Sequence, residues 1–217
     1  MIVSKREHAC LTVEHDGSTL VIDPGSFTAP FVVENLVAIV VTHEHADHVT
    51  PEHLDRLLAA AREADPDREV ALLAPAGVAA AHPDRPWHVV DAGDRVTAGP
   101  FTLAFSGGRH ALIHRTIPVI DNVGVFVNET LYYPGDSFAV PDGPVPVLAV
   151  PASAPWLKIG DVMDYVDAVR PARAFPTHER VNSEAGNSMA NARIAHVTEQ
   201  HGGTFVPLVA GESLELD

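Results

Sequence analysis

The stretch "VAIVVTHEHADHVTPEHL" at residues 37–54 constrains the fold more than any other part of the sequence. It opens with five apolar residues, which suit a buried strand, and it ends in the start of a helix. Thr50 can cap that helix, and Pro51 suits its first position. The helix is expected over residues 51–64, where apolar side chains recur at helical spacing: Leu54, Leu57, Leu58 and Ala61. A histidine-rich loop therefore joins a buried strand to a capped helix.

That loop carries four side chains of the metal-ligand type, His43, His45, Asp47 and His48. In a tight strand-to-helix loop, the first two can close on one metal ion while the last two turn toward a second. Imidazole suits zinc and its first-row relatives, and an aspartate adds a harder oxygen ligand. The alternative is a polar loop that is rich in histidine by chance, since the chain has 13 histidines. The strand, loop and helix context favours the metal site.

Two metal ions need more ligands than this loop offers, and other apolar runs end in suitable residues. His110 follows "FTLAFSGGR", Asp136 follows "TLYYPG", and His178 follows "ARAFPT". Each is weak evidence alone, because a strand-end histidine is often solvated and "PGD" is an ordinary turn. Together they complete two sets and a bridge: His43, His45 and His110 on one ion, Asp47, His48 and His178 on the other, and Asp136 between them. We expect two divalent ions, zinc first, with manganese or iron as alternatives because two carboxylates take part.

Composition narrows the range of partners. The chain has 14 Lys and Arg against 29 Asp and Glu, a formal net charge of −15, and shows no basic cluster. Nucleic acid is therefore not an expected partner, because its backbone would need a strongly segregated basic patch. The single cysteine, Cys10, excludes an internal disulfide and a multi-cysteine metal site. Its apolar surroundings favour a place in the core over a nucleophilic role.

The length of 217 residues fits one large α/β domain over residues 1–217, and two small domains are the less favoured alternative. The N-terminus is charged where a signal peptide needs an apolar core, and no apolar run reaches the roughly 20 residues that a bilayer span requires. We therefore expect a soluble cytoplasmic protein without a membrane partner. The sequence leaves a homo-oligomer open.

Short strand-type runs separated by turn signals fill the first half of the chain. They are "ACLTVE", "TLVID", "VAIVV", "EVALLA", "RVTAG", "FTLAFS", "VGVFVN" and "TLYY". Further helices are expected over residues 160–169 and roughly 187–200. The Pro-rich segment 138–155 is expected to be a loop that enters a strand at "VLAV". This order indicates two sheets packed face to face with helices outside.

The sequence resembles the metallo-β-lactamase superfamily. The resemblance rests, in order, on "TLVIDPG", "THEHADH", "GGRH", "YYPGDS" and "FPTH", which span nearly the whole chain. It implies an α/β fold, the αββα sandwich of two mixed β-sheets flanked by helices, with all seven ligand positions filled. "NVGVFVNETLYYPGDSF" and "PASAPW" are similar to the stand-alone metal-dependent hydrolase branch, which includes sugar-phosphate lactonases. The chain departs from lactamases with a metal-binding cysteine, since Cys10 lies in no ligand motif, and from flavodiiron oxygen reductases, which have Glu at the position of His45.

The resemblance also implies roles around the ions. Asp23 stands where the superfamily has an acid just outside the metal shell, although a turn aspartate before Pro24 is an equal alternative on local grounds. A metal-bridging hydroxide is expected to cleave an ester, lactone or phosphodiester of a small molecule. Asp47 is the expected catalytic residue, which orients the hydroxide and passes its proton to the leaving group. The loaded site keeps a charge of about +1, so an anionic substrate would be attracted to it.

Candidate substrate contacts are Arg109, His114, Trp156 and Lys158, although an ordinary surface role is the favoured alternative for each. Two histidines compete for the third place on the first ion. His110 is expected to be the ligand, because it lies two residues beyond Gly108, where a glycine pair is expected to end a strand. His114 is then left as a pocket residue.

Two other classes of function remain open. A metal-binding sensor or structural protein on the same fold would keep the ligands without turnover, because fold and ligands do not fix function. A nuclease is less favoured because of the negative net charge.

Overall fold

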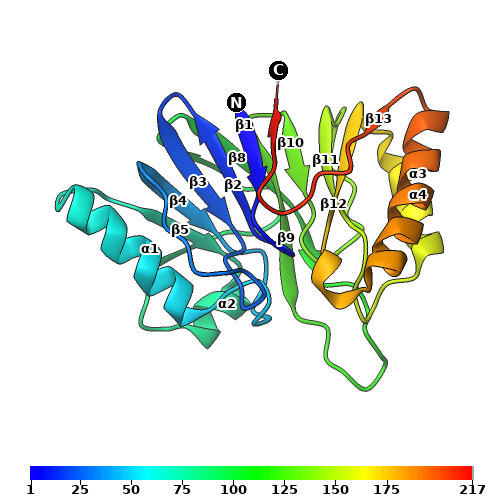
Figure 1. Ribbon diagram of the computed structural model, residues 1–217. Coiled ribbons are helices and arrows are strands. Elements are labelled where there is room, and N and C mark those ends of the chain that lie inside the picture. The colour runs from blue at the N-terminus through cyan, green and yellow to red at the C-terminus, as the bar shows by residue number, and fades with distance from the viewer. Residues whose placement is uncertain (217) are drawn as a thin grey trace.

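The computed structural model describes residues 1–216 and contains two seven-stranded β-sheets. Figure 1 shows the sheets packed face to face, with α1 and α2 covering the outer face of one and α3 and α4 that of the other. Each sheet contains both parallel and antiparallel strand pairs. The predicted α/β sandwich of two mixed sheets flanked by helices is therefore confirmed.

The first sheet combines the N-terminal strands with the last strand of the chain. In spatial order its strands are β14 (Ser213–Glu215), β1 (Ile2–Lys5), β2 (Leu11–His15), β3 (Ser18–Ile22), β4 (Leu36–Val40), β5 (Ala71–Ala74) and β6 (Trp87–Val89). β3 to β6 pair in parallel, and the other neighbours pair antiparallel. Because β14 pairs with β1, the two ends of the chain lie side by side (Figure 1).

The second sheet follows the chain from one edge to the other. In spatial order its strands are β13 (Thr204–Phe205), β12 (Arg173–Thr177), β11 (Val147–Pro151), β10 (Leu131–Tyr133), β9 (Asp121–Val127), β8 (Phe101–Arg109) and β7 (Arg95–Ala98). β10 to β13 pair in parallel, and β7 to β10 pair antiparallel. β11 confirms the strand predicted at "VLAV".

One predicted boundary in this sheet is wrong. The glycine pair after "FTLAFS" does not end the strand, because Gly107 and Gly108 pair with Val123 and Asn122 of β9 and β8 continues to Arg109. Both glycines have a positive φ, 88° and 121°, which few other residues adopt. The strand therefore changes its local course through the glycines without losing its partner.

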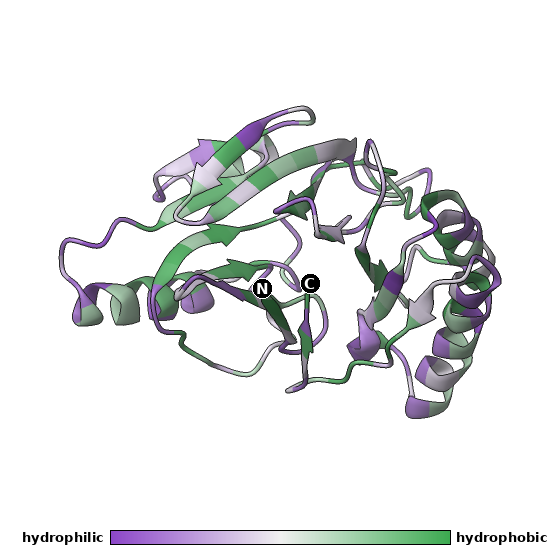
Figure 2. Ribbon diagram, turned by 90° about the horizontal axis from the view of Figure 1, so that it is seen from above, coloured by the Kyte–Doolittle hydropathy of each residue, from purple (hydrophilic) through white to green (hydrophobic). Residues whose placement is uncertain are grey.

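Three apolar layers hold the sandwich together. The middle layer lies between the sheets and includes Leu20, Phe101, Val125 and Phe175. The two outer layers lie between each sheet and its helices. Figure 2 shows the same division, with hydrophobic strands in the middle and helices that carry hydrophilic residues along their length. Cys10 is fully buried in the layer beneath α1, and this burial raises the pKa of its thiol, which suits the predicted core role.

Two of the helices follow their sequence signals closely. α1 (Pro51–Ala64) has the predicted bounds, and the Thr50 side chain accepts a hydrogen bond from the amide of His53. α3 (Ile159–Val169) confirms the second predicted helix.

Among the remaining helices, one begins earlier than predicted and two were not predicted. α4 (Glu184–Gln200) begins earlier than predicted because Ser183 caps it by accepting a hydrogen bond from the amide of Gly186. Two further elements are not among the predicted ones, α2 (Ala76–Ala81) and the short 3₁₀ helix η1 (Glu179–Val181). Over residues 1–216, the structure contains no helix of sufficient length and apolar character to cross a membrane.

The candidate ligands gather at one edge of the sandwich. In the first sheet this edge receives the carboxyl ends of β3 and β4, which are parallel neighbours. In the second sheet β8, β10 and β12 end there, since β8 and β10 both run antiparallel to β9. Carboxyl ends of parallel strands are a common place for binding sites. The amide of Val123 donates to the carbonyl of Thr42 at 3.0 Å, which ties the two sheets together at this edge.

Candidate metal centre

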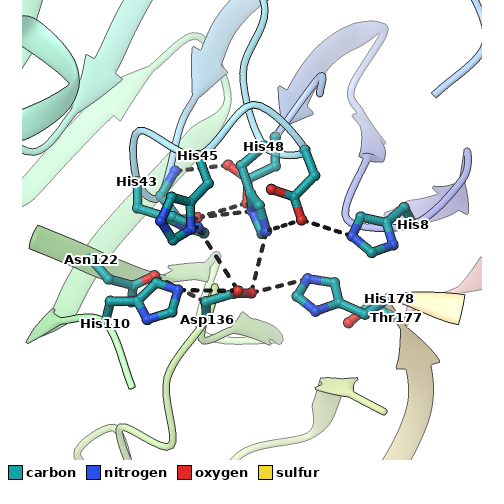
Figure 3. Close-up of polar contacts among 12 residues, drawn as sticks. His8, His43, His45, His48, His110, Asn122, Asp136, Thr177 and His178 are labelled. Carbon is teal, nitrogen blue, oxygen red and sulfur yellow. Dashed lines mark hydrogen bonds and ion pairs between the residues drawn. The ribbon is translucent and has the colours of Figure 1, made fainter. Parts of the chain in front are cut away.

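The histidine-rich loop connects β4 to α1 and is held in a tight conformation by backbone hydrogen bonds. The amide of His48 donates to the carbonyl of His45 at 2.9 Å, and the amide of Ser26 donates to the carbonyl of Ala46 at 2.8 Å. His43 and His48 have no exposed surface, whereas His45 is half-buried. The loop thus brings three imidazoles from one short segment to the sheet edge (Figure 3).

Asp136 lies at the middle of this centre and is almost fully buried. Its amide donates to Oδ1 of Asn122 at 3.0 Å, and its carbonyl accepts the amide of Ala111 at 2.8 Å, so its backbone is fixed on both sides. Figure 3 shows contacts that run from its carboxylate to imidazole rings on both sides.

The two carboxylate oxygens of Asp136 face different histidines. Oδ2 lies 3.3 Å from Nε2 of His110 and 3.9 Å from Nε2 of His43. Oδ1 lies 3.3 Å from Nε2 of His48 and 3.2 Å from Nε2 of His178. A single carboxylate therefore separates two groups of imidazoles.

The first group consists of His43, His45, His110 and Asp136, each with a ligand atom within 4.8 Å of the others. Nδ1 of His110 lies 2.6 Å from the carbonyl of Ala111, a contact that leaves Nε2 to face the group. The structure thus brings together the three histidines that the sequence analysis assigned to one ion.

The second group consists of His8, His48 and His178, also within 4.8 Å of one another. Asp47 was predicted to join His48 and His178, and His8 was not among the predicted site residues. Asp47 lies beside the group, with its Oδ2 3.8 Å from Nε2 of His48 and 3.1 Å from Nε2 of His8. His8 is therefore an additional residue of the centre, between Asp47 and His178.

Several buried atoms of the centre lack a hydrogen-bond partner. Within residues 1–216 these include four that point at the two groups: Nε2 of His48, Nε2 of His110, Nε2 of His178 and Oδ1 of Asp136. Leaving buried polar atoms unpaired costs about 1–3 kcal/mol each, so such a cluster calls for a further partner. Imidazole nitrogens around a carboxylate are a donor set that suits zinc, iron or manganese. The residues present therefore fit divalent metal ions.

Residues 3–178 match the β-lactamase superfamily domain. The chain belongs to the metallo-β-lactamase superfamily. The predicted resemblance is confirmed at this level, and the similarity to sugar-phosphate lactonases stays a prediction. Protein Rv0786c of Mycobacterium tuberculosis is 37% identical over 201 residues, which cover 88% of this chain and 90% of that protein.

Two solved structures illustrate how widely the fold is used. Igni18, a metallo hydrolase from the archaeon Ignicoccus hospitalis, is 15% identical with a TM-score of 0.69, and the match covers 98% of this chain and 97% of Igni18. CmlA, a diiron β-hydroxylase from Streptomyces venezuelae, is 16% identical with a TM-score of 0.70 over 99% of this chain and 54% of CmlA. At these identities the comparison shows a shared fold, and one of the two proteins is named a hydrolase and the other a hydroxylase.

Asp23 lies directly behind the histidine-rich loop and is fully buried. Its carboxylate accepts hydrogen bonds from the amide and the hydroxyl of Thr42, both at 2.7 Å. The same carboxylate lies 2.7 Å from Nδ1 of His48. The other ring nitrogen of His48, Nε2, faces Asp136. Such a partner fixes the tautomer and the orientation of a ligating histidine. Asp23 thus orients His48, in addition to ending its strand.

Burial and charge act in opposite directions on the ionisable groups. Burial lowers the pKa of His43 well below its usual range and lowers the pKa of His178 to about 4. Burial also works to lower the pKa of His48, but the carboxylates of Asp136 and Asp23 outweigh it and raise that pKa. Burial works to raise the pKa of Asp136, yet His178 and His48 hold it well below the usual range. At neutral pH the lowered pKa values of His43 and His178 favour the neutral imidazole, the form in which histidine binds a metal ion, whereas the raised pKa of His48 means that it would lose a proton on binding one.

The predicted substrate contacts lie at different distances from the centre. Trp156 is half-buried, and its indole nitrogen donates to Oδ2 of Asp136 at 2.7 Å. Arg109 is exposed and donates to the carbonyl of Val119, and exposed His114 contacts the hydroxyl of Thr116. Lys158 is exposed at the N-cap of α3. Trp156 thus reaches the centre, while the other three lie on the surface.

Proposed function

We propose that this protein is a hydrolase that holds two divalent metal ions and cleaves an ester, lactone or phosphodiester bond of a small molecule. The observation that carries the proposal is the position of Asp136, whose Oδ2 faces His43 and His110 and whose Oδ1 faces His48 and His178. A buried carboxylate with a separate pair of imidazoles at each oxygen suits a bridge between two ions. Zinc is the first candidate, and manganese and iron are alternatives.

When bound, two such ions would lower the pKa of a water to about 7 and polarise the bond to be cleaved. The chain itself supplies orientation and proton transfer. Asp136 keeps the two ligand groups together, and Asp23 orients the ring of His48. Asp47 is the candidate proton carrier, because its side chain is 29% exposed beside the second group. Within the described residues its Oδ1 accepts no hydrogen bond, whereas its Oδ2 is hydrogen-bonded to His8, so Oδ1 is the atom that would take a proton from water and deliver it to the leaving group.

We further propose an anionic small molecule as substrate. The ions would give the centre a local positive charge inside a chain with a formal net charge of −15. Arg109, His114 and Lys158 are exposed and could reach a substrate at the rim, whereas Trp156 would contact it near the bridge.

The experiment removes the metal with a chelator, reloads the protein with Zn²⁺, Mn²⁺ or Fe²⁺, counts ions per chain and assays lactones, phosphodiesters and thioesters. We expect two ions per chain, loss of activity on chelation and recovery on reloading. Asp47→Ala should abolish turnover and weaken the second ion without unfolding the protein, whereas Asp142→Ala, in an exposed loop, should change neither. Activity that survives complete removal of metal would contradict the proposal.

Two other outcomes would favour a different function. Two bound ions without turnover on any substrate class would favour a sensor or structural protein. Retention on single-stranded RNA at physiological salt would favour a nuclease.

A further inference from the structure

His8 occupies a turn in which contacts with three residues hold it in place. It lies between β1 and β2 with a φ of 55°, in the left-handed region that few non-glycine residues occupy, and it is only 1% exposed. Its amide donates to Oε1 of Glu179 at 2.9 Å, and its carbonyl accepts the amide of His178 at 2.9 Å. Its ring stacks on the ring of His178 at a centroid distance of 4.6 Å, and Phe27 packs edge-on against it. These contacts fix both the backbone and the ring of His8.

The carboxylate of Glu179, which accepts the amide of His8, is paired with a buried lysine. The ammonium group of Lys5 lies 2.8 Å from Oε2 of Glu179 and donates to the carbonyl of Leu208 at 3.3 Å. Lys5 is 1% exposed, so it is committed to this ion pair. Glu179 directly follows His178, and it therefore links the backbone of His8 to the strand end that carries a candidate ligand.

The ring of His8 has one polar contact, and it goes to Asp47. Nε2 of His8 lies 3.1 Å from Oδ2 of Asp47, while Nδ1 is buried and has no partner within residues 1–216. A proton on Nδ1 would leave a buried donor unsatisfied and would turn the Nε2 lone pair toward a carboxylate. A proton on Nε2 avoids both penalties, because it completes a hydrogen bond to Asp47. The contacts therefore favour the tautomer in which His8 donates.

We propose that His8 is a positioning residue that donates from Nε2 to Asp47 and thereby holds this carboxylate against the second ligand group. The inference rests on the proposed binuclear site. Asp47 comes from a loop, and within the described residues the hydrogen bonds and ion pairs of its side chain go only to His8 and His48, so the closer contact, with His8, sets where its carboxylate points. In this arrangement Nε2 of His8 is not a metal ligand, because a nitrogen that donates a proton has no lone pair to offer a metal ion. The alternative is that His8 itself ligates the second ion with His48 and His178.

Two substitutions separate donation from ligation. His8→Phe keeps a ring of similar shape to stack on His178 but removes the donor. His8→Gln places an amide N–H near the position of Nε2, and an amide is a good donor but a poor ligand for zinc. A partner that orients a ligand typically contributes 10–100-fold in metal affinity. We expect His8→Phe to weaken binding of the second ion by about 10–100-fold and leave the first ion unchanged, and we expect His8→Gln to restore most of the loss.

The measurement is competition between the protein and a chelator for Zn²⁺, together with the visible absorption of protein loaded with Co²⁺ at the second site. In an Asp47→Ala background, His8→Phe should cause no further loss, because the carboxylate that it acts upon is gone. A buried histidine outside the centre provides the matched control. His53 lies in α1 with Nε2 near the carbonyl of Thr28, and His53→Phe should leave both ion affinities unchanged.

Three results would overturn the inference. If His8→Gln is as weak as His8→Phe and the losses from His8 and Asp47 multiply, then His8 is a ligand. If His8→Phe binds both ions as the unaltered protein does, then it has no role in the centre. If both ions weaken equally in His8→Phe, then the substitution disturbs the whole edge of the sandwich. Failure of the proposed function is distinct, because the unaltered protein would then bind fewer than two ions.

Discussion

The indole nitrogen of Trp156 donates a hydrogen bond to Oδ2 of Asp136 at 2.7 Å. This is the oxygen that faces His43 and His110, so the indole shares it with the first ligand group. The ring itself is held by an edge contact with Phe138 at a centroid distance of 5.2 Å. Trp156 thus restrains the rotation of the carboxylate that separates the two groups.

Trp156→Phe should keep the ring contact and lose the donor. We expect the affinity for the first ion to fall by about tenfold, because Asp136 would lose the partner that fixes one of its oxygens. Chelator competition on the purified variant measures this loss. The only other tryptophan, Trp87, donates to the carbonyl of His82 away from the centre, and Trp87→Phe should leave the affinity unchanged. Equal affinities for the two variants would contradict the role of the indole.

Asp23→Asn tests the carboxylate behind His48. The amide oxygen could still accept one hydrogen bond from Thr42, but the buried negative charge beside His48 would be lost. We expect the affinity for the second ion to fall by about 10–100-fold. Removing one partner of a buried charged pair should also lower the free energy of unfolding of the metal-free protein by about 3 kcal/mol or more. Urea unfolding in chelator measures the stability, and Asp142→Asn on an exposed loop serves as control. A metal-free variant as stable as the parent would mean that Asp23 only ends its strand.

Elements with local signals could be predicted from the sequence, and elements that depend on distant partners could not. α1 was predicted with its bounds because Thr50 caps it and its apolar residues recur at helical spacing. α2 spans six residues, four of them alanine, which is too short for a helical period to emerge. β14 has three residues and depends on pairing with β1 at the opposite end of the chain. Such pairings are set by tertiary packing, which no local pattern encodes.

The same distinction holds for the centre. His43, Asp136 and His178 could be proposed because each follows an apolar run, so its place at a strand end is readable. His8 could not, because it is a lone histidine in the charged segment "SKREHAC". Its place depends on the stack with His178 and on the bond from its amide to Glu179, which join residues far apart in the sequence. A pattern of spacing contains no such information.

Gly25→Ala tests how closely the ligand loop is packed. A Cβ at Gly25 would lie 1.9 Å from the carbonyl oxygen of Asp47 and 2.4 Å from the amide nitrogen of His48. Both are backbone atoms, so the loop would have to move. We expect a loss of about 3 kcal/mol or more in stability and a lower metal content, measured by urea unfolding and metal analysis.

Gly160 in α3 provides the control for this substitution. Among the described residues, a Cβ at Gly160 would meet no atom within 4 Å beyond the backbone of its own helix. Gly160→Ala should therefore be neutral or slightly stabilising, because alanine favours the helix over glycine. A Gly25→Ala protein with full metal content and unchanged stability would show that the ligand loop can shift to accept the added methyl group.

The two histidines of "GGRHALIHR" differ in their surroundings. His110 is 4% exposed, its Nε2 faces Asp136, and its Nδ1 lies 2.6 Å from the carbonyl of Ala111. His114 is exposed, and its Nδ1 lies 2.7 Å from the hydroxyl of Thr116. One ring is thus committed to the centre and the other to a local turn.

We therefore expect His110→Ala to lower the metal content, because the first group would keep only His43, His45 and the shared carboxylate. The loss should fall on one ion, since the second group lies on the other side of Asp136. His114→Ala should retain both ions and change mainly turnover. Metal analysis of the two purified variants decides between them, with thermal unfolding in chelator as the check on folding. If His114→Ala loses an ion and His110→Ala keeps both, the two roles must be exchanged.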